Sequence, residues 1–236
     1  MNLKEVMTKL EKLGNAQQRK TYAAHGARGN FFGVKIGDLK VIAKKLKGDQ
    51  GLALSLFDTG NLDAMYLAGL VADGGRMSRK ELDGWAKTAT WGMISDYTVA
   101  WVAAESPVGR ELALKWMDSK QELVARAGWN AYAGLVAVTP DSQLDLPEIE
   151  SLLARVEKQI HTAPNRVRYC MNNFVISVGG YVKPLSAKAK ATARRIGPVE
   201  VDMGDTSCQV PSAVDRIARI EASGKLGVKR KTVKCA

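Results

Sequence analysis

The sequence has few of the residues that build disulfide frameworks or structural metal sites. Its three cysteines, Cys170, Cys208 and Cys235, lie far apart and form no Cys-x-x-Cys pair, and its two histidines are His25 and His161. This set argues against a disulfide scaffold and against a zinc site built from cysteine and histidine. We therefore expect no metal and no cofactor, and a reducing compartment inside the cell.

Long apolar runs are also missing. No stretch reaches the roughly 18 apolar residues that a membrane span needs. Charged residues at positions 4, 5 and 9 interrupt the region where a signal peptide would have its apolar core. We therefore expect a cytoplasmic protein that has no membrane partner.

Acidic residues are outnumbered by basic ones. The chain has 24 Asp and Glu against 35 Lys and Arg, which gives a formal net charge of +11. A surplus of this size favours a polyanionic partner, chiefly nucleic acid, because Lys and Arg bind phosphates and release counterions. An acidic protein partner or a basic but inert surface would fit the same balance. Charge therefore indicates the class of partner without selecting it.

Alternating runs typical of strands are absent, and apolar residues recur at helical spacing instead. The predicted helices are short, are joined by short turns and arrive in pairs, which is typical of an all-α solenoid. A compact helical bundle is the alternative. Ser78 with Glu81 forms a predicted capping box, and Asp38 is expected to cap the helix that follows it. The predicted helices cover residues 1–14, 16–25, 39–46, 51–57, 62–72, 78–87, 106–117, 121–138, 144–160, 165–178, 186–196 and 211–222.

The C-terminal part differs from the rest. We expect residues 1–198 to form the helical domain, and residues 199–236 to contain an irregular segment, a short helix and a basic tail. Residues 225–234 carry five Lys and Arg. Such a tail is either a frayed, solvated terminus or a flexible arm that adds phosphate contacts without specificity.

Residues 90–101 place one carboxylate among several aromatic side chains. Trp91, Asp96, Tyr97 and Trp101 lie around an expected helix start. A structural interpretation is a buried aromatic stripe with an acidic residue near the positive end of the helix dipole. A functional interpretation is that Asp96 belongs to a catalytic or binding site, because a single carboxylate among aromatic residues is unexpected in a basic protein suited to polyanions.

The segment 30–44, with the sequence NFFGVKIGDLKVIAK, resembles the AlkD-like DNA alkylation repair family, in which an aromatic-Gly-Val-basic loop precedes a helix of this pattern. The resemblance continues through residues 91–96, Arg126 and the helix around Arg168, and covers about residues 1–196. It implies HEAT-like helical repeats whose concave, positively charged face holds duplex DNA. It also implies a glycosylase that releases N3- or N7-alkylated purines without drawing the nucleotide into a deep pocket.

The resemblance assigns Asp96 the role of the catalytic carboxylate, Trp91 that of the aromatic residue before it, and Arg126 that of the phosphate-binding residue. An alkylated purine is already a cationic leaving group, so the carboxylate is needed only to stabilise positive charge on the sugar or to position water. Electron-rich aromatic faces also favour a nearby cation. The candidate DNA-contacting residues are Arg126, Tyr97, Trp101, Trp129, Lys35, Arg168 and Asn173.

The spacing of Trp91 and Asp96 departs from the family pattern. In the active members the two residues are four apart, whereas here they are five apart and Ser95 takes the fourth position. Five residues correspond to roughly 140° around a regular α-helix. Either Trp91 lies before the helix start and still reaches the site, or the catalytic aromatic residue is missing.

A further Trp of the family is absent from the helix around residues 166–174, where Asn173 or Phe174 takes its place. Asn172 could bind sugar or phosphate, or could bond to local backbone. Two alternatives to a glycosylase therefore stay open. One is a non-catalytic DNA-binding module of the same family, and the other is a protein-interaction scaffold of the kind that solenoids often form.

Overall fold

The computed structural model describes residues 1–234, and in this part of the chain all regular secondary structure is helical. The all-α prediction is confirmed. The α-helices are α1 (Leu3–Lys12), α2 (Ala16–Ala24), α3 (Ile36–Lys45), α4 (Gln50–Asp58), α5 (Leu62–Val71), α6 (Arg79–Thr88), α7 (Ala100–Ala104), α8 (Gly109–Met117), α9 (Glu122–Val138), α10 (Leu146–Gln159), α11 (Asn165–Tyr181), α12 (Ser186–Ile196) and α13 (Ala213–Ala222). A π-helical turn, η2 (Ile94–Val99), precedes α7, and the 3-10 turns are η1 (Gly74–Arg76), η3 (Asp141–Gln143) and η4 (Lys183–Leu185).

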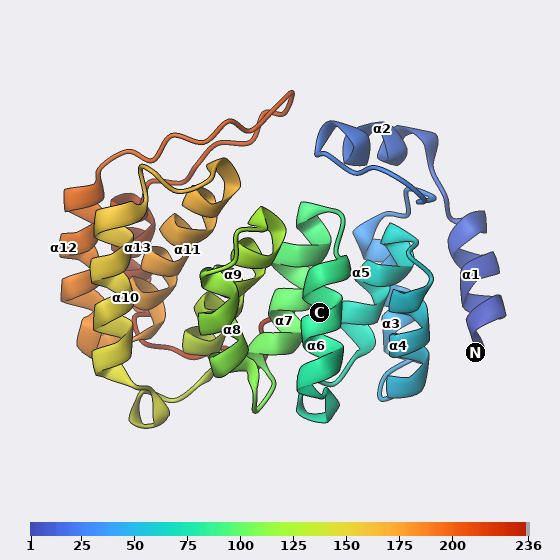
Figure 1. The fold of residues 1–236 in the computed structure, drawn as a ribbon, viewed down its shortest axis with the longest axis horizontal. Coiled ribbons are helices and arrows are strands. Elements are labelled where there is room, and N and C mark those ends of the chain that lie inside the picture. The colour runs from blue at the N-terminus through green and yellow to red at the C-terminus, as the bar shows by residue number, and fades with distance from the viewer. Residues whose placement is uncertain (235–236) are drawn as a thin grey trace.

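The helices form one row that runs from α1 at one end of the molecule to α12 and α13 at the other (Figure 1). Each of α5, η2 with α7, α9, α11 and α13 packs on the next, and these helices make up an inner layer. Helices α4, α8, α10 and α12 pack against this layer from the outside. The arrangement is that of the predicted solenoid, in which each helix pair buries its apolar side against its neighbours.

Small residues allow neighbouring helices to approach closely. A Cβ atom added at Gly128 of α9 would lie 2.6 Å from the backbone nitrogen of Met117 in α8. One added at Gly69 of α5 would lie 2.7 Å from the Cα atom of Thr98 in η2. Because neither position has room for a side chain, these glycines determine how tightly α8 packs on α9 and α5 on η2.

The loop before α3 is held by a buried carboxylate. Asp63 accepts hydrogen bonds from the backbone N–H groups of Phe32, Gly33 and Val34, at 2.6, 3.1 and 2.8 Å. These bonds satisfy donors that would otherwise be unpaired, and they set the direction in which the chain enters α3. The helix starts three residues earlier than predicted, so Asp38 lies in its first turn and does not cap it. The prediction of Asp38 as a cap is wrong.

Helix α11 is longer than predicted. Gly179 and Gly180 were expected to form a connector, but they lie within the last turn of α11. A Cβ atom added at Gly180 would lie 2.8 Å from Cδ1 of Ile220, and one at Gly179 would collide with Ile217. The glycines therefore give α13 room to pack against the end of α11. The capping box of Ser78 and Glu81, in contrast, is confirmed.

Residues 197–212 form an extended arm that leaves α12, passes over the start of α11 and reaches toward α2 (Figure 1). Asn165 and Asp202 exchange two hydrogen bonds of 2.9 and 2.8 Å between side chain and backbone. Asn172, which is buried, donates to the carbonyl oxygen of Pro211 at 2.9 Å, so it bonds to backbone and has no surface for DNA. At the tip, Sγ of Cys208 lies 3.6 Å from Nε2 of His25.

Over residues 225–234 the basic tail is neither frayed nor free, so the predictions of a frayed terminus and of a flexible arm are wrong there, while its phosphate contacts stay a prediction. It runs back across the C-terminal ends of inner helices. The N–H of Gly227 donates to Gly180 at 2.8 Å, and that of Arg230 donates to Ala137 at 2.8 Å. Lys234 donates its ammonium group to the carbonyl oxygen of Ala72. Cations are favourable at these helix ends because the helix dipole is negative there. Cys235 lies outside the described residues.

None of the helices in residues 1–234 combines the length and the apolar character needed to cross a membrane.

Candidate functional site

Asp96 lies on the π-helical turn at the start of an inner helix. In η2 the N–H of Ala100 donates to the carbonyl oxygen of Ser95, five residues earlier, where an α-helix would use the fourth. Ser95 is buried and donates its hydroxyl to the carbonyl oxygen of Leu123 in α9. The rotation of roughly 140° expected for a regular α-helix therefore does not apply. Ser95 points toward α9, whereas Asp96 lines the cavity described below.

The Asp96 carboxylate is paired with the guanidinium group of Arg126 from α9. Nε of Arg126 lies 3.0 Å from Oδ1, and Nη2 lies 2.5 Å from Oδ2. The two side chains keep only 17% and 15% of their surface exposed. A Cβ atom added at Gly92 would collide with the guanidinium group, so this glycine provides the space for the pair. Arg126 is thus not a solvent-facing charge.

Burial and charge act in opposite directions on this pair. Burial raises the pKa of Asp96 above its ordinary value, and the charge and hydrogen bonds of Arg126 oppose that rise. Burial alone would lower the pKa of Arg126, but the charge and hydrogen bonds of Asp96 raise it above its ordinary value. The carboxylate therefore depends on Arg126 for its ionised form.

A thiol and an amide lie beside the pair. Sγ of Cys170 is 4.0 Å from Oδ1 of Asp96, and the side-chain amide of Asn130 donates to the same sulfur at 3.1 Å. Burial raises the pKa of the Cys170 thiol well above its ordinary value, so this group stays protonated at neutral pH. It offers no nucleophile to the site.

Trp91 lies just before the helix start, since its carbonyl oxygen accepts the N–H groups of Ile94 and Ser95 at 2.9 and 3.1 Å. Its ring is buried, packs against Tyr22 with centroids 5.1 Å apart, and donates its N–H to the carbonyl oxygen of His25 at 2.9 Å. This answers in part whether Trp91 lies before the helix start and reaches the site. Trp91 precedes the helix and lines the same cavity as Asp96, but packing holds its ring in place.

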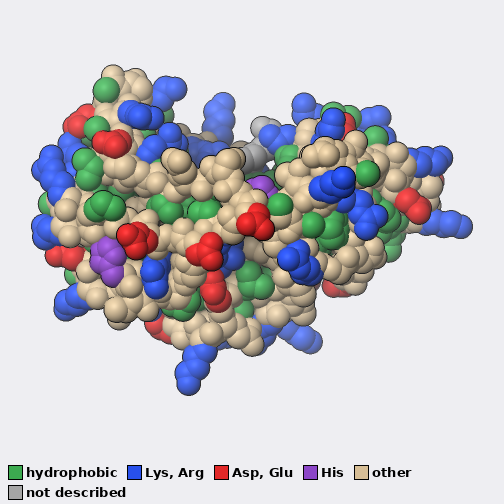
Figure 2. Space-filling model, turned by 90° about the horizontal axis from the view of Figure 1, so that it is seen from above, with side chains coloured by type: hydrophobic (Ala, Val, Ile, Leu, Met, Phe, Trp, Pro, Cys, Tyr) green, Lys and Arg blue, Asp and Glu red, His purple; other side chains and the backbone are tan. Residues whose placement is uncertain are grey.

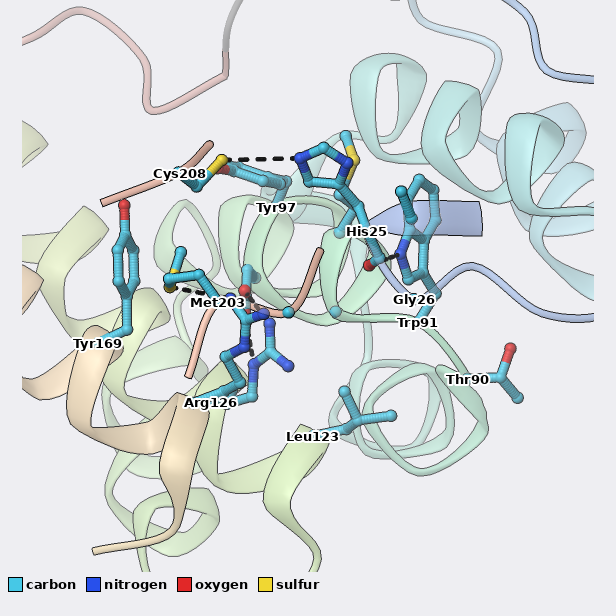
Figure 3. Close-up of a pocket in the computed structure, with 16 residues that line it drawn as sticks. His25, Gly26, Thr90, Trp91, Tyr97, Leu123, Arg126, Tyr169, Met203 and Cys208 are labelled. Atoms are coloured by element: carbon cyan, nitrogen blue, oxygen red, sulfur yellow. Dashed lines mark hydrogen bonds and ion pairs between the residues drawn. The ribbon is translucent and has the colours of Figure 1, made fainter. Parts of the chain in front are cut away.

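The cavity next to the Asp96–Arg126 pair measures about 460 Å³. His25 and Trp91 line one side of it, and Tyr169 stands on the opposite side (Figure 3). Met203 and Cys208 of the extended arm also line it, so the cavity lies between the inner helices and the arm.

Three further aromatic candidates differ in exposure. Tyr97 is 41% exposed and packs against Trp101, with ring centroids 5.2 Å apart. Trp101 is mostly buried and lines a groove of about 320 Å³ that also adjoins Asp96. Trp129 is 1% exposed and packs in the core against Phe174. The expectation that Trp129 contacts DNA is wrong, because its ring has no surface to offer.

The polar candidates also have different surroundings. Asn173 lines the groove while its neighbour Phe174 is buried, so Asn173 holds the groove-facing position in this helix. Arg168 donates to the carbonyl oxygen of Ala163 at 2.7 Å and to that of Glu200 in the arm at 3.4 Å. Lys35 is exposed at the start of α3. Asn173 and Lys35 stay candidates for DNA contact, whereas Arg168 supports the arm.

Several cations that gather at another cavity were not among the candidates. Lys40, Lys44 and Lys47 line a cavity of about 530 Å³ together with Lys234 of the tail. The first three have no carboxylate of residues 1–234 within 4.0 Å. Figure 2 shows blue Lys and Arg side chains on both sides of the hollow in the molecule. The spacing of Lys40 and Lys44 along α3, with Lys47 just after the helix, was a signal for this cluster, whereas the sequence has no signal for the contribution of the tail.

No group of three or more His, Cys, Asp or Glu side chains in residues 1–234 is placed to hold a metal ion.

A family model described as DNA alkylation repair enzyme matches residues 6–189. The chain belongs to this family. The resemblance inferred from residues 30–44 is thereby confirmed, and it extends over most of the helical row.

Similar proteins cover nearly the whole chain. An uncharacterized protein of Listeria innocua and one of Listeria monocytogenes are each 32% identical over 218 residues, which is 90% of this chain and 94% of theirs. A solved structure is 40% identical, with a TM-score of 0.91 and full coverage of both chains. It is described as "a new family of proteins related to the HEAT-like repeat DNA glycosylases with affinity for branched DNA structures". The fold of this protein is accordingly a HEAT-like helical-repeat superhelix.

Proposed function

We propose that this protein binds branched DNA along its inner side and does not excise bases. The observation that carries the proposal is the two-point ion pair between Asp96 and Arg126. In the family resemblance the carboxylate is the catalytic group, and here both of its oxygens accept hydrogen bonds from one guanidinium group. The helical superhelix would thus bind DNA, while the Asp96 carboxylate stays paired with Arg126.

Charge supports the DNA-binding part of the proposal. The net charge is +11, and the ammonium groups of Lys40, Lys44 and Lys47 have no carboxylate partner within residues 1–234. Phosphates are the natural partners of such a cluster. The solved structure with affinity for branched DNA is 40% identical over the full chain, which favours the same class of ligand here.

The chemistry of the pair supports the second part. To stabilise positive charge on a sugar, a carboxylate must bring a free oxygen close to the reacting carbon. Charge-assisted hydrogen bonds of this two-point kind are among the strongest in proteins, and here they match the Asp96 charge with that of Arg126. The pair as a whole carries no net charge, so it offers a cationic sugar less stabilisation than an unpaired carboxylate would, and separating this mostly buried pair would be costly.

The test compares binding and excision with the same preparation. A three-way DNA junction and a linear duplex of equal strand length are titrated at two salt concentrations, and duplex containing N7-methylguanine is assayed for released base. We expect tighter binding of the junction, weaker binding at higher salt, and no released base. Equal affinity for the two DNAs, or binding that does not respond to salt, would contradict the proposal.

A second candidate function is hydrolysis of the glycosidic bond of alkylated purines. It is favoured by one observation, that Asp96 and Trp91 line the same cavity. Base release by the wild-type protein that Asp96→Asn abolishes would establish this function and overturn the non-catalytic proposal. A scaffold for an acidic protein partner stays a prediction from charge, and a cytoplasmic location agrees with either activity on DNA.

A further inference from the structure

The groove lined by Trp101 and Asn173 adjoins Asp96 on the side of α13 and the tail, and its lining differs from that of the cavity at Lys40, Lys44 and Lys47. It measures about 320 Å³. We call it the tyrosine cleft. Its floor and walls combine aromatic rings, small apolar residues and a few polar groups, which is the composition of a site for a flat organic ligand. Its lining includes Tyr97, Trp101, Tyr169, Asn173, Ser177, Tyr181, Arg216 and Arg230.

Tyr97 provides a firmly backed aromatic surface in this cleft. Its ring is 41% exposed and packs at 5.2 Å, tilted by 54°, against Trp101. Trp101 in turn packs edge-on against the buried ring of Tyr66, with centroids 5.6 Å apart. A ring supported by two others loses little freedom when a ligand stacks on it, so stacking there costs little entropy.

Polar groups with spare hydrogen-bonding capacity surround this ring. Asn173 donates to Oδ1 of Asn130 at 3.4 Å, which leaves its own amide oxygen without a donor in residues 1–234. The hydroxyl groups of Tyr169, Ser177 and Tyr181 make no side-chain hydrogen bond within the same part of the chain. The edge of a nucleobase offers the donors and acceptors that such groups need.

Two guanidinium groups from different segments stand at the cleft. Arg216 comes from α13 and Arg230 from the tail, and no carboxylate of residues 1–234 lies within 4.0 Å of either. The backbone of Arg230 is fixed by the hydrogen bond from its N–H to Ala137 at 2.8 Å. An aromatic surface next to free arginines suits a nucleotide, with the base on the ring and the phosphates on the cations.

From these features we infer that the tyrosine cleft binds one unpaired base at the branch point of DNA. This inference rests on the proposed function and adds to it. Bases within a duplex are stacked on their neighbours and cannot offer a face to Tyr97, whereas an unpaired base can. The cavity at Lys40, Lys44 and Lys47 is lined, within residues 1–234, by no aromatic ring, so its ammonium groups suit the phosphates of a paired arm better than a base.

The experiment measures the affinity for two three-way junctions that differ only in two unpaired thymines at the branch point. Stacking on an aromatic side chain contributes about 1–3 kcal/mol per base, so we expect the junction with unpaired bases to bind about 5- to 150-fold more tightly. Tyr97→Leu should bring this ratio close to one, and Tyr97→Phe should keep it. A 2-aminopurine at the unpaired position should be quenched by the wild-type protein and by Tyr97→Phe, but not by Tyr97→Leu.

Charge variants provide a matched control. Arg216→Gln should weaken binding of the junction with unpaired bases, while Arg194→Gln on the outer helix α12 should not; Arg194 is also exposed and has no ion pair within the described part of the chain. Melting temperatures verify that each variant is folded. Equal affinity of the wild-type protein for both junctions would overturn the inference and leave the proposed function standing. Failure to prefer any junction over linear duplex would instead contradict the proposed function.

Discussion

The guanidinium group of Arg126 and the carboxylate of Asp96 meet through two hydrogen bonds, Nε to Oδ1 at 3.0 Å and Nη2 to Oδ2 at 2.5 Å. This contact joins η2 to α9 at the centre of the inner layer. Both groups are mostly buried, so each is costly to leave without the other.

Removing one partner of this pair should destabilise the fold. Replacing Arg126 with Leu leaves the Asp96 charge without its counter-charge, and we expect a loss of about 3 kcal/mol in the free energy of unfolding at pH 7. Urea denaturation measures it. The double variant Asp96→Asn with Arg126→Leu should be more stable than the single variant. A single variant as stable as the wild type would show that the pair is not maintained in solution.

The loss should also depend on pH. Burial raises the pKa of Asp96 in the folded state, and removing Arg126 takes away what opposes that rise. A carboxyl group whose pKa is higher in the folded than in the unfolded state makes unfolding easier as pH rises between the two values. The deficit of Arg126→Leu should therefore shrink when denaturation is repeated near pH 4. A deficit that grows in acid would contradict this sign.

Gly92→Ala should act through the same pair. The added methyl group collides with the Arg126 guanidinium group, while the backbone at Gly92 has no positive φ that would strain an alanine. We expect a loss of about 1–3 kcal/mol from the overpacked contact. In a double-mutant cycle with Arg126→Leu the two losses should not add, because the second change removes the clashing group. Additive losses would place the effect of Gly92→Ala elsewhere.

The lysine cluster should govern the salt dependence of DNA binding. Each phosphate contact contributes about 0.9 to the slope of log affinity against log salt on duplex DNA. Changing Lys40, Lys44 and Lys47 to Gln together should therefore reduce the slope by roughly two to three. The control changes Lys158 and Arg194 to Gln, two exposed cations on the outer helices α10 and α12. An unchanged slope in the triple variant would exclude the cluster from the interface.

A second pH effect should come from the contact between α6 and α8. Asp83 of α6 accepts hydrogen bonds from Lys87 at 2.7 Å and from the indole N–H of Trp116 in α8 at 2.8 Å. These bonds lower the pKa of Asp83 to about 2. Because this value lies below that of the unfolded chain, the contribution is present above about pH 4 and is lost as pH falls toward 2. Asp83→Asn should cost about 2 kcal/mol at pH 7 and less at pH 3, measured by urea denaturation. An equal cost at both pH values would contradict the assignment.

Helix content could be predicted from local features, because spacing of apolar residues and capping residues act within a few positions. The helix 186–196 and the capping box at Ser78 are examples. The start of α3 was missed because it depends on Asp63, some thirty residues away, whose carboxylate holds the preceding loop. The end of α11 was missed for a similar reason, since the glycines there are explained only by the packing of α13.

The site was predictable in part. Asp96, Trp91 and Arg126 line one cavity, and the family resemblance had named all three from the sequence alone. The sequence has no local signal for the π-helical turn, which decides that Asp96 and not Ser95 lines the cavity. Trp129 and Tyr97 are both aromatic residues among apolar neighbours in the sequence. Trp129 faces the core and Tyr97 faces the groove because their helices are oriented differently, which the sequence does not show.

The path of the tail has a consequence for how the chain is assembled. Repeats in a solenoid contact their neighbours, so the row can in principle form progressively from its first helices as they are made. Lys234, however, caps the carbonyl oxygen of Ala72 across 162 positions of sequence, and Arg230 completes the tyrosine cleft. The helices that precede the tail can therefore fold before the tail completes the tyrosine cleft and caps α5. Binding competence should appear late in synthesis, as a separate step after the solenoid itself has formed.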